Sequence, residues 1–347
     1  MINTIKLSIC IATYNRAGFI KETLDSIFSQ NSDQIEVVVL DGGSSDGTEE
    51  LVKVYEEKYS NFRYIKLLAK GGYDEDISSA VSHAKGEYCW LFSDDDIIKP
   101  GGIDYILSKL TQDHDVVIVN SEVKNQTLTK VLKSKCINLS KDEVFNSESF
   151  ERFFILTAPH TSFLGCVVIK RSIWDSRDKS KYFGTMFVHV GVLFQSRYDG
   201  DLLVIADPLV SIRYGNAMWT VRSFEISLLI WPKLIFGFNM FSNDAKQLVC
   251  PINPWESIPR LLFYRARGSY SEEQYNEFLV GRLGFIKRAL AYLIAIAPGR
   301  ALNLIFYVYF YVCRIFHPNA SLILIDLENS IYYSGFGFIN RLIWKRK

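Results

Sequence analysis

The sequence predicts an α/β fold with a mostly parallel sheet flanked by helices and a helical C-terminal appendage. Strand-like apolar runs alternate with helical patterns over roughly the first 120 residues, an order typical of a parallel sheet covered on both faces. After residue 224 the pattern is helical and is interrupted by prolines. At 347 residues the chain has room for both parts. We therefore expect one domain over residues 1–220 and a helical region over residues 221–347.

The first strands and helices follow from the spacing of apolar residues. Residues 7–12 form a short β-rich run, residues 19–28 place apolar side chains at helical spacing, and residues 35–40 are almost continuously aliphatic. Asp46 stands three positions before Glu49, which resembles a capping box at the start of the next helix. These patterns predict a strand–helix–strand unit followed by a second helix.

The alternation of strands and helices continues, less regularly, to about residue 215. Further strands are predicted at 64–68, 88–92, 116–119, 166–169, 202–205 and 209–212. Further helices are predicted at 76–84, 102–110, 150–156 and 187–198. We expect the elements after residue 120 to extend the sheet.

Charge and cysteine content exclude several classes of protein. The formal net charge is +1, which gives no electrostatic reason to bind nucleic acid. The six cysteines lie far apart without C-x-x-C spacing, as expected of reduced core residues. The N-terminus has no long apolar segment typical of a signal peptide. We expect a cytoplasmic protein that has no nucleic acid partner.

The C-terminal region is both basic and apolar. From residue 281 onward, nine Lys or Arg residues stand against two acids, a local balance of +7. Residues 289–297 and 301–313 are apolar, but each stretch is shorter than the roughly 18 to 20 residues that cross a bilayer. This composition favours amphipathic helices on a membrane surface beside anionic head groups, and ordinary core helices are the alternative.

Three consecutive carboxylates, Asp94, Asp95 and Asp96, follow the strand predicted at 88–92. They therefore lie at its carboxyl end, the edge where open α/β sheets bind ligands. Adjacent carboxylates repel one another, and Mg²⁺ or Mn²⁺ commonly holds such a group ionised. The acid triplet indicates a metal site for a phosphate-bearing substrate. The alternative is a solvated acidic loop or a helix N-terminus.

Three sequence blocks occur in a characteristic order and spacing. They are LSICIATYNR at 7–16, IEVVVLDGGSSDGT at 35–48, and AKGEY at 84–88, which runs into the acid triplet. Together these blocks resemble the family 2 glycosyltransferases of GT-A fold over roughly residues 5–215. Within that family, residues 88–92, FGT at 183–185 with His189, and PWE at 254–256 are most similar to the abequosyltransferases of bacterial O-antigen assembly.

The resemblance implies a metal-dependent reaction that inverts the configuration of the anomeric carbon, as is usual in this family. It implies transfer of a sugar from a nucleotide-sugar donor to a lipid-linked oligosaccharide acceptor in surface polysaccharide (O-antigen) biosynthesis. Such an enzyme is expected to be peripheral on the inner face of the plasma membrane. Two alternatives stay open: a sugar-phosphate nucleotidyltransferase, and a non-catalytic assembly partner that kept the GT-A fold.

By the same resemblance, the donor is bound at the ends of the first two strands and near the acid triplet. The residues expected to bind it are Thr13, Tyr14, Asn15, Arg16, Asp41, Asp74, Asp76, Asp94 and Arg213. Several have a plain structural alternative. Asp41 either contacts the nucleoside or holds a turn, and Asp74 and Asp76 either bind sugar hydroxyls or cap a helix. Arg213 either closes over the diphosphate or packs at a domain boundary.

The resemblance makes Asp95 the expected metal ligand and catalytic residue. Asp96 is the expected second ligand of Mn²⁺ or Mg²⁺, and the alternatives are Asp94 in that role or an acid that only supports the ligands. The family's Asp-x-Asp-Asp pattern falls on residues 93–96, so Ser93 stands where the first acid is usual. Gly42 likewise stands at a family Asp position. These two departures leave the identity of the nucleotide open.

The expected general base is His189. The family usually has an acid in this region, but residues 184–189 read GTMFVH. A neutral imidazole has an ordinary pKa near 6.5 and is able to accept the proton of an acceptor hydroxyl. A structural histidine is the alternative, with Asp199 and Asp201 as substitute acids.

Overall fold

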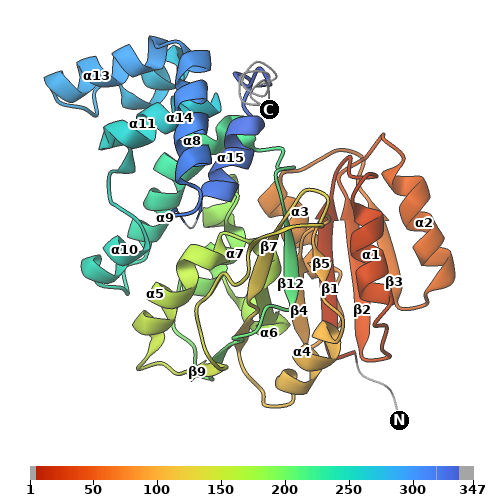
Figure 1. Cartoon of the computed structure of the whole chain (residues 1–347). Helices are drawn as coiled ribbons and strands as arrows, with labels where there is room; N and C mark the ends of the chain where they lie inside the picture. Colours follow the sequence, from red (N-terminus) through yellow and green to blue (C-terminus); the bar gives the residue numbers. More distant parts are fainter. Residues whose placement is uncertain (1–4, 318, 336–347) are drawn as a thin grey trace. The chain divides into compact units, whose positions relative to one another are not determined.

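The computed structural model describes residues 5–317 and 319–335 (Figure 1). The chain forms two compact units. The first comprises Met1–Arg213 and Leu234–Cys250, and the second comprises Tyr214–Lys233 and Pro251–Lys347. Residue 220, where we expected a domain boundary, lies in the first segment of the second unit.

An eight-stranded sheet with the order β3-β2-β1-β4-β10-β6-β11-β9 forms the centre of the first unit. Its strands are β1 (Leu7–Thr13), β2 (Ile35–Asp41), β3 (Phe62–Lys66), β4 (Tyr88–Phe92), β6 (Val116–Ile118), β9 (Glu143–Phe145), β10 (Val167–Lys170) and β11 (Leu202–Val204). The four strands from β3 to β4 are parallel, and β11 is parallel to β6. β10 is antiparallel to both of its neighbours, and β9 is antiparallel to β11. The carboxyl ends of β1, β2 and β4 therefore meet at one edge.

Helices flank this sheet, which confirms the predicted α/β class. Those of the first unit are α1 (Ile20–Phe28), α2 (Thr48–Lys58), α3 (Tyr73–Ser82), α4 (Gly102–Leu110), α5 (Phe150–Thr161), α6 (Arg171–Ser176), α7 (Val188–Phe194) and α10 (Asn243–Val249). A second, four-stranded sheet has the order β5-β12-β7-β8. Its strands are β5 (Ile97–Ile98), β7 (Ser121–Asn125), β8 (Val131–Lys133) and β12 (Val210–Tyr214).

The helix predicted at 187–198 is shorter in the structure, where α7 ends at Phe194. The cause is a distant side chain. Arg177, buried and 8% exposed, donates hydrogen bonds to the carbonyl oxygens of Leu193 at 3.0 Å, Ser196 at 3.1 Å and Arg197 at 3.0 Å. A guanidinium satisfies the last carbonyls of a helix in place of further helical N–H groups. The local pattern carries no sign of this contact.

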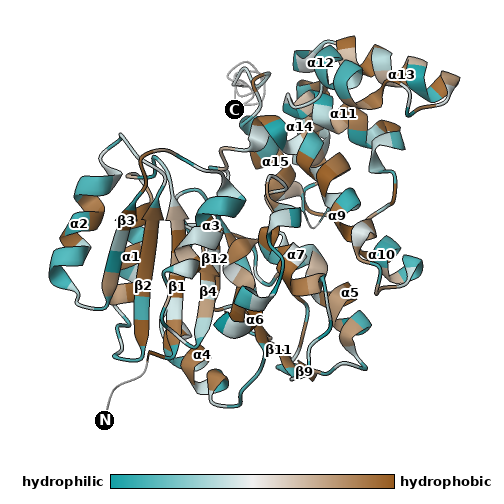
Figure 2. Cartoon of the chain, turned by 180° about the vertical axis from the view of Figure 1, so that it is seen from behind, coloured by the Kyte–Doolittle hydropathy of each residue, from teal (hydrophilic) through white to brown (hydrophobic). Residues whose placement is uncertain are grey.

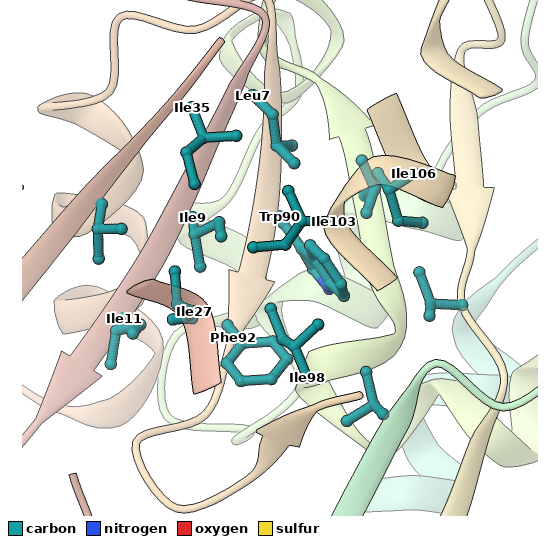
Figure 3. Close-up of a cluster of buried hydrophobic side chains, with 14 of the residues drawn as sticks. Leu7, Ile9, Ile11, Ile27, Ile35, Trp90, Phe92, Ile98, Ile103 and Ile106 are labelled. Atoms are coloured by element: carbon teal, nitrogen blue, oxygen red, sulfur yellow. The ribbon is translucent and has the colours of Figure 1, made fainter. Parts of the chain in front are cut away.

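Alternating positions of the central strands build the main hydrophobic core (Figure 3). Ile9 of β1 and Trp90 of β4 share this core with Ile103 of α4, and none of the three is exposed. The Trp90 ring lies edge-on to Phe92, with centroids 5.4 Å apart. Its Nε1 donates a hydrogen bond of 2.8 Å to the carbonyl oxygen of Gly165. The strand that carries the acid triplet is therefore anchored by packing and by a buried hydrogen bond.

The segment Leu234–Cys250 belongs to the first unit because of aromatic packing. The Phe241 ring stacks on Phe154 of α5, with centroids 3.9 Å apart and ring planes 9° apart. Phe238 meets Phe194 of α7 at 5.9 Å. Such ring contacts bury large apolar areas and add about 0.5–1.5 kcal/mol per pair beyond that burial.

The second unit is helical, as predicted for the C-terminal appendage. Its helices are α8 (Ser223–Glu225), the π-helical turn Ile226–Ile230, α11 (Ile258–Arg267), α12 (Glu272–Gln274), α13 (Phe285–Ile296), α14 (Gly299–Cys313) and α15 (Ala320–Glu328), while α9 (Trp231–Gly237) crosses the boundary between the units. Phe224 stacks on Tyr270 in its core at 4.7 Å. Asp326 Oδ1 forms an ion pair with Arg267 Nη2 at 3.0 Å and accepts a hydrogen bond from the Tyr214 hydroxyl at 2.9 Å.

Within residues 5–317 and 319–335, no single helix is long and apolar enough to cross a membrane. The helices α13 and α14 meet the length and composition criteria only as a pair, and their axes are bent by 94° at the break between them.

Replacing Trp90 by Phe tests the anchoring of β4. The substitution leaves a cavity and removes the donor to the buried Gly165 carbonyl, so we expect the free energy of unfolding to fall by about 2–4 kcal/mol. Urea unfolding of both proteins measures this difference. The control is Val54→Ala on α2, where the side chain is 60% exposed and a change within about 0.5 kcal/mol is expected. Equal losses in the two variants would contradict the anchoring role.

Candidate active site

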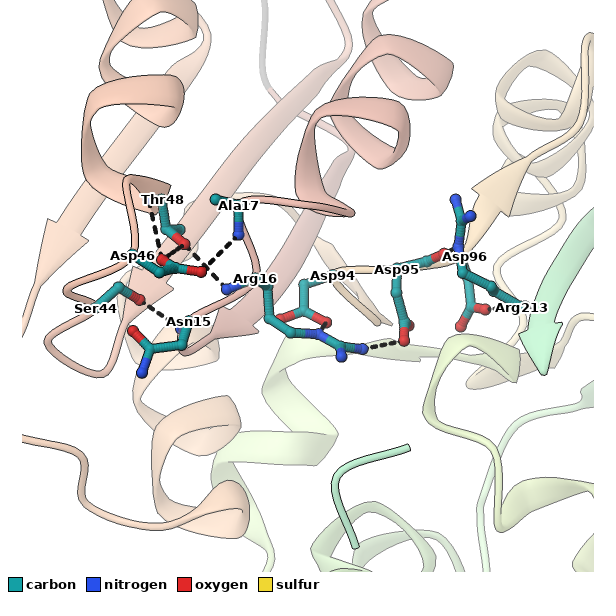
Figure 4. A network of polar contacts seen from close by, with 10 residues as sticks. All are labelled: Asn15, Arg16, Ala17, Ser44, Asp46, Thr48, Asp94, Asp95, Asp96 and Arg213. Carbon is teal, nitrogen blue, oxygen red and sulfur yellow. Dashed lines mark hydrogen bonds and ion pairs between the residues drawn. The ribbon is translucent and has the colours of Figure 1, made fainter. Parts of the chain in front are cut away.

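The loop after β1 is tied to the loop after β2 (Figure 4). Asn15 has a left-handed backbone with φ of 53°, and its N–H donates to Ser44 Oγ at 2.8 Å. Its side-chain Oδ1 accepts from the Ser45 N–H at 2.9 Å. The Ala17 N–H donates to Asp46 Oδ2 at 3.1 Å. These bonds make the two predicted nucleotide-binding loops a single structural element.

Arg16 connects this element to the acid triplet. Its Nε donates to Asp94 Oδ1 at 3.1 Å, and its Nη2 forms an ion pair with Asp95 (Figure 4). The three side chains are nearly buried, with exposed fractions of 9%, 13% and 14%. The guanidinium also lies over the Phe19 ring, 4.7 Å from its centroid. The first and third predicted site motifs therefore meet, although 78 residues separate Arg16 from Asp94.

Arg213 holds the other side of the triplet. Its backbone N–H donates to Asp96 Oδ1 at 2.7 Å, and its Nε donates to the Asp95 carbonyl oxygen at 2.9 Å. Its Nη1 donates to the Gln126 carbonyl oxygen at 2.7 Å, and its Nη2 forms an ion pair with Glu22. Every nitrogen of the guanidinium has a protein partner. These contacts fix Arg213 against the acid triplet, and its closure over a diphosphate stays a prediction.

Burial and mutual repulsion perturb the acids. Burial raises the pKa of Asp94 to about 6, the charge of Asp95 raises it as well, and Arg16 opposes both. Burial, followed by the Asp95 charge, raises the pKa of Asp96 well above its ordinary value. The charges of Asp94 and Asp95 raise the Arg16 pKa despite the opposing effect of burial. The guanidinium therefore stays charged and favours ionised acids.

The charges around the triplet do not balance. Among the residues that the structure describes, two guanidinium groups, of Arg16 and Arg213, face four carboxylates, those of Glu22, Asp94, Asp95 and Asp96. When all are ionised, the cluster carries two more negative than positive charges. Carboxylate oxygens are the ligands that Mg²⁺ and Mn²⁺ prefer, and a divalent cation would balance this excess. The residues present therefore fit the predicted metal in charge and donor chemistry.

Asp41 is fully buried at the end of β2. Its Oδ1 accepts from the N–H and the hydroxyl of Ser44, at 2.8 and 2.7 Å, and its Oδ2 accepts from the Tyr64 hydroxyl at 2.7 Å. Burial, together with the Asp41 charge, raises the pKa of Tyr64. Asp41 thus holds the turn that also binds Asn15. A nucleoside contact by Asp41 stays a prediction.

Asp74 connects α3 with the start of α7. Its two carboxylate oxygens accept from the backbone N–H groups of Met186 at 2.7 Å and Val188 at 2.9 Å. Met186 has a left-handed φ of 69°, which helps to bring these N–H groups around the acid. Burial raises the Asp74 pKa, although the two N–H groups oppose the shift. Asp74 is therefore a cap, but of a helix more than 100 residues away.

Asp76 lies beside the turn after β2. Its Oδ1 accepts from the Gly71 N–H at 3.2 Å. A Cβ atom at Gly42 would lie 3.4 Å from Asp76 Oδ2 and 3.4 Å from the backbone of Lys70. The carboxylate of Asp76 thus stands next to the position where the family usually has a second acid. Its contact with a sugar or nucleoside stays a prediction.

Thr13 and Tyr14 lie at the same sheet edge. Thr13 ends β1, pairs with Asp41 of β2 and is 4% exposed. The half-buried Tyr14 follows it, and the Lys70 Nζ lies over the Tyr14 ring, 4.8 Å from its centroid.

His189 is enclosed in the protein, at 1% exposure on α7. Its Nε2 lies 2.7 Å from the carbonyl oxygen of Thr161, and burial lowers its pKa to about 4. The ring is therefore neutral, with the proton on Nε2. These surroundings match the structural alternative and lend no support to a role as general base. The substitute acids Asp199 and Asp201 are exposed between α7 and β11.

Two residues of the site, Phe19 and Glu22, lie outside the sequence motifs that predicted it. The Phe19 ring lies between two guanidinium groups, 4.7 Å from that of Arg16 and 5.3 Å from that of Arg213. Glu22 stands in the first turn of α1 and pairs with Arg213. Phe19 directly precedes α1 and Glu22 follows three positions later in its first turn, a spacing that is visible in the sequence.

Known proteins resemble this chain in sequence. Residues 8–175 match the family described as "Glycosyl transferase family 2". Abequosyltransferase RfbV of Salmonella typhimurium is 30% identical over 225 residues, which cover 60% of this chain and 67% of that protein. The GalNAc(5)-diNAcBac-PP-undecaprenol beta-1,3-glucosyltransferase of Campylobacter jejuni is 25% identical over 147 residues, 42% of this chain and 47% of that one. The chain thus spans less than half of this second relative.

Two solved structures share the fold. S. aureus TarS 1-349 in complex with UDP-GlcNAc is 17% identical, with a TM-score of 0.53. The superposition covers 93% of this chain and 90% of the other. The mannosyltransferase PcManGT from Pyrobaculum calidifontis, in complex with GDP-Man and Mn²⁺, is 15% identical, with a TM-score of 0.50. The superposition covers 99% of this chain and 88% of the other. These likenesses confirm the predicted GT-A fold.

The buried position of His189 predicts a pH dependence of stability. In the unfolded chain this histidine is protonated below about pH 6.5, whereas in the folded chain it is protonated only below about pH 4. Because the unfolded state binds more protons in this window, stability falls as the pH drops through it, by about 2–3 kcal/mol for this group.

Urea unfolding at about pH 7 and pH 4.5 measures that loss. The pH-dependent loss should be smaller by about 2–3 kcal/mol in His189→Gln, which removes the titrating ring. His160 is also buried, with a pKa lowered to about 4, and serves as the matched comparison because His160→Gln should behave alike. An unchanged pH dependence in both variants would refute the buried, neutral state.

Proposed function

Because the chain belongs to glycosyl transferase family 2, we propose that it transfers one sugar from a nucleotide-sugar donor to a lipid-linked saccharide acceptor in surface polysaccharide (O-antigen) biosynthesis. The observation that carries this proposal is the acid triplet held between Arg16 and Arg213 at the carboxyl end of β4. The family makes the chain a glycosyltransferase. It thereby favours this activity over the nucleotidyltransferase and over the non-catalytic partner.

A nucleoside diphosphate sugar is the proposed donor class. TarS is described with UDP-GlcNAc and PcManGT with GDP-Man, two donors that share a diphosphate and differ in base and sugar. In this chain, the turn around Asp41 and the loop at Asn15 lie at the sheet edge next to the triplet. These loops are the proposed nucleoside site, with Asp76 beside them at Gly42.

The proposed acceptor is a saccharide on a lipid carrier. One relative is named an abequosyltransferase, and another is named for an acceptor linked through diphosphate to undecaprenol. A lipid carrier resides in a membrane. The proposal therefore places this enzyme on the inner face of the plasma membrane as a peripheral protein.

Asp95 and Asp96 are the proposed ligands of a divalent cation, Mn²⁺ or Mg²⁺. Among the described residues, no three or more His, Cys, Asp or Glu side chains are grouped as a metal site. The two acids would therefore share the ion with diphosphate oxygens of the donor. When bound, the ion supplies Lewis acidity that stabilises the leaving nucleoside diphosphate.

The proposed reaction is a single displacement at the anomeric carbon. The acceptor oxygen forms a bond to this carbon while the bond to the diphosphate oxygen breaks, which inverts the configuration. The hydroxyl proton passes to a base, and the nucleoside diphosphate leaves. In this scheme, Arg16 holds Asp94 and Asp95 in place through ion pairs, and Arg213 fixes Asp95 and Asp96 through main-chain contacts. Preorganised charge of this kind is typically worth 10²- to 10³-fold in rate.

Replacing Asp95 by Asn tests the central role of the triplet. Because the change removes the proposed cation ligand but keeps the size, we expect kcat/KM to fall at least about 100-fold. The assay follows nucleotide release from UDP-, GDP-, CDP- and dTDP-sugars with Mn²⁺, with and without acceptor. Asp104→Asn is the control, because Asp104 is an exposed acid on α4 and its loss should change kcat/KM less than twofold.

Two results would refute this proposal. One is an Asp95→Asn enzyme that keeps activity within a few-fold of the wild type. The other is release of pyrophosphate in place of a nucleoside diphosphate, which would indicate a nucleotidyltransferase.

Metal removal tests the cation separately. We expect EDTA to abolish transfer and Mn²⁺ to restore it, since the excess negative charge of the triplet otherwise repels the diphosphate. Binding alone is measured by thermal unfolding. Mn²⁺ with nucleoside diphosphate should raise the Tm of the wild type and of Asp104→Asn but not that of Asp95→Asn. Full activity after exhaustive chelation would show that this enzyme needs no metal.

A further inference from the structure

Exposed apolar side chains gather in one short segment of the second unit. Of the 27 large apolar side chains that are exposed in the described part of the chain, 15 lie within residues 280–316. This segment is only about a tenth of the sequence. Phe285, Ile315 and Phe316 are 78%, 82% and 87% exposed. Single exposed apolar residues are ordinary on soluble proteins, but a concentration like this marks an interaction surface.

The outward side of α13 is apolar. Ile286, Leu290 and Leu293 recur at helical spacing and are 73%, 42% and 58% exposed. The buried side of the same helix contains Ala291 and Ile294. A surface helix of a water-soluble protein normally turns polar residues outward. This helix has apolar residues on both sides, and Figure 2 shows brown segments along it.

The outward side of α14 repeats this pattern. Ile305, Val308 and Val312 follow one another at helical spacing and are 61%, 41% and 67% exposed. Asn303 and Phe310 form its buried side. Two consecutive helices thus present apolar stripes that no described residue covers. We call these two stripes, together with Phe285, Ile315 and Phe316, the apolar face.

The charges around the apolar face have one sign. No Asp or Glu occurs between Glu277 and Asp326, while this interval contains Arg282, Lys287, Arg288, Arg300 and Arg314. Two of these cations lie against aromatic rings of the same segment. Arg288 is over the Phe285 ring at 5.9 Å, and Arg314 is over the Tyr311 ring at 4.6 Å. Apolar side chains flanked by Arg and Lys are the composition of helices that lie in the interface of an anionic bilayer.

We propose that the apolar face binds the surface of an anionic lipid bilayer, with α13 and α14 lying in the interface. This inference rests on the proposed function, because it names the membrane partner that a lipid-linked acceptor requires. The lengths of the helices argue against crossing: 12 and 15 residues correspond to about 18 and 22 Å, which is less than the roughly 30 Å of hydrocarbon. Two helix axes that meet at 94° are able to lie together in one plane.

The charge pattern also decides between a membrane and a second copy of the chain. A symmetric dimer through the apolar face would bring two acid-free, basic segments together, and like charges oppose such contact. An anionic bilayer supplies the missing negative charge and takes up the apolar side chains at once. Tyr292, Tyr309 and Tyr311 are 37%, 56% and 46% exposed, and tyrosine is enriched at membrane interfaces.

Vesicle flotation of the full chain tests the proposal without any enzymatic step. The probes are vesicles of phosphatidylcholine alone and of phosphatidylcholine with about 30% phosphatidylglycerol. We expect binding to the anionic vesicles to be at least about tenfold tighter, and added salt to weaken it. The double variant Ile286→Gln/Ile305→Gln should lose at least about tenfold in binding to them.

Three controls make the result specific. Arg288→Gln/Arg314→Gln should lose the preference for anionic over neutral vesicles while keeping the apolar face. Val54→Gln replaces an exposed apolar residue of α2, outside the apolar face, and should bind like the wild type. Thermal shift with donor nucleotide and Mn²⁺ shows that the variants are folded, and it reports on the donor site independently of vesicle binding.

Vesicle binding that is equal in the wild type and in Ile286→Gln/Ile305→Gln would overturn the proposal. So would a wild-type chain that ignores vesicles but dimerises through the same residues. Donor binding without vesicle binding would leave the proposed function standing and refute only the membrane surface. Vesicle binding without any response to donor would support the membrane surface and contradict the proposed function.

Discussion

The ion pairs of Arg16 with Asp94 and Asp95 are the interaction on which the rest of the site depends. Three adjacent acids at the end of a buried strand repel one another and lose hydration, so they need a cation at short range. Arg16 supplies one from the loop after β1. Its own backbone N–H donates to Thr48 Oγ1 at 3.0 Å, next to the turn after β2. One residue therefore holds together the three loops at the carboxyl edge of the sheet.

Much of this fold was predictable because its signals are local. The strands at 7–12, 35–40 and 88–92 are continuous apolar runs, and their order already implied parallel pairing with the acids at a shared edge. The contribution of Arg213 was harder to foresee. It reaches Asp96 across 117 residues, and no periodicity encodes a contact of that kind. The position of β10, antiparallel between β4 and β6, also depends on contacts between residues far apart in the sequence, so periodicity does not predict it.

Asp74 of α3 and His189 of α7 show why residue type alone does not assign a role. Asp74 looked like a ligand or a local cap, yet it binds N–H groups at the start of α7, more than 100 residues away. His189 lies in α7, the helix that Asp74 caps, three positions after Met186. Its Nε2 lies against the carbonyl oxygen of Thr161. Burial then lowers its pKa to about 4. Burial and partners come from the fold, and they decide whether an ionisable group does chemistry or holds structure.

The near-neutral net charge of the chain conceals a separation of charge that its proposed activity needs. Among the described residues around the acid triplet, four carboxylates outnumber two guanidinium groups, and this excess of negative charge is the reason for proposing a divalent cation there. Between Glu277 and Asp326 every charged residue is basic, which is the sign of charge that binding to the proposed anionic bilayer requires. A total of +1 gives no electrostatic reason to expect a polyanion partner for the whole protein, but it does not describe these local charges. The distribution of charge along the folded chain, rather than its sum, distinguishes the proposed donor site from the proposed membrane surface.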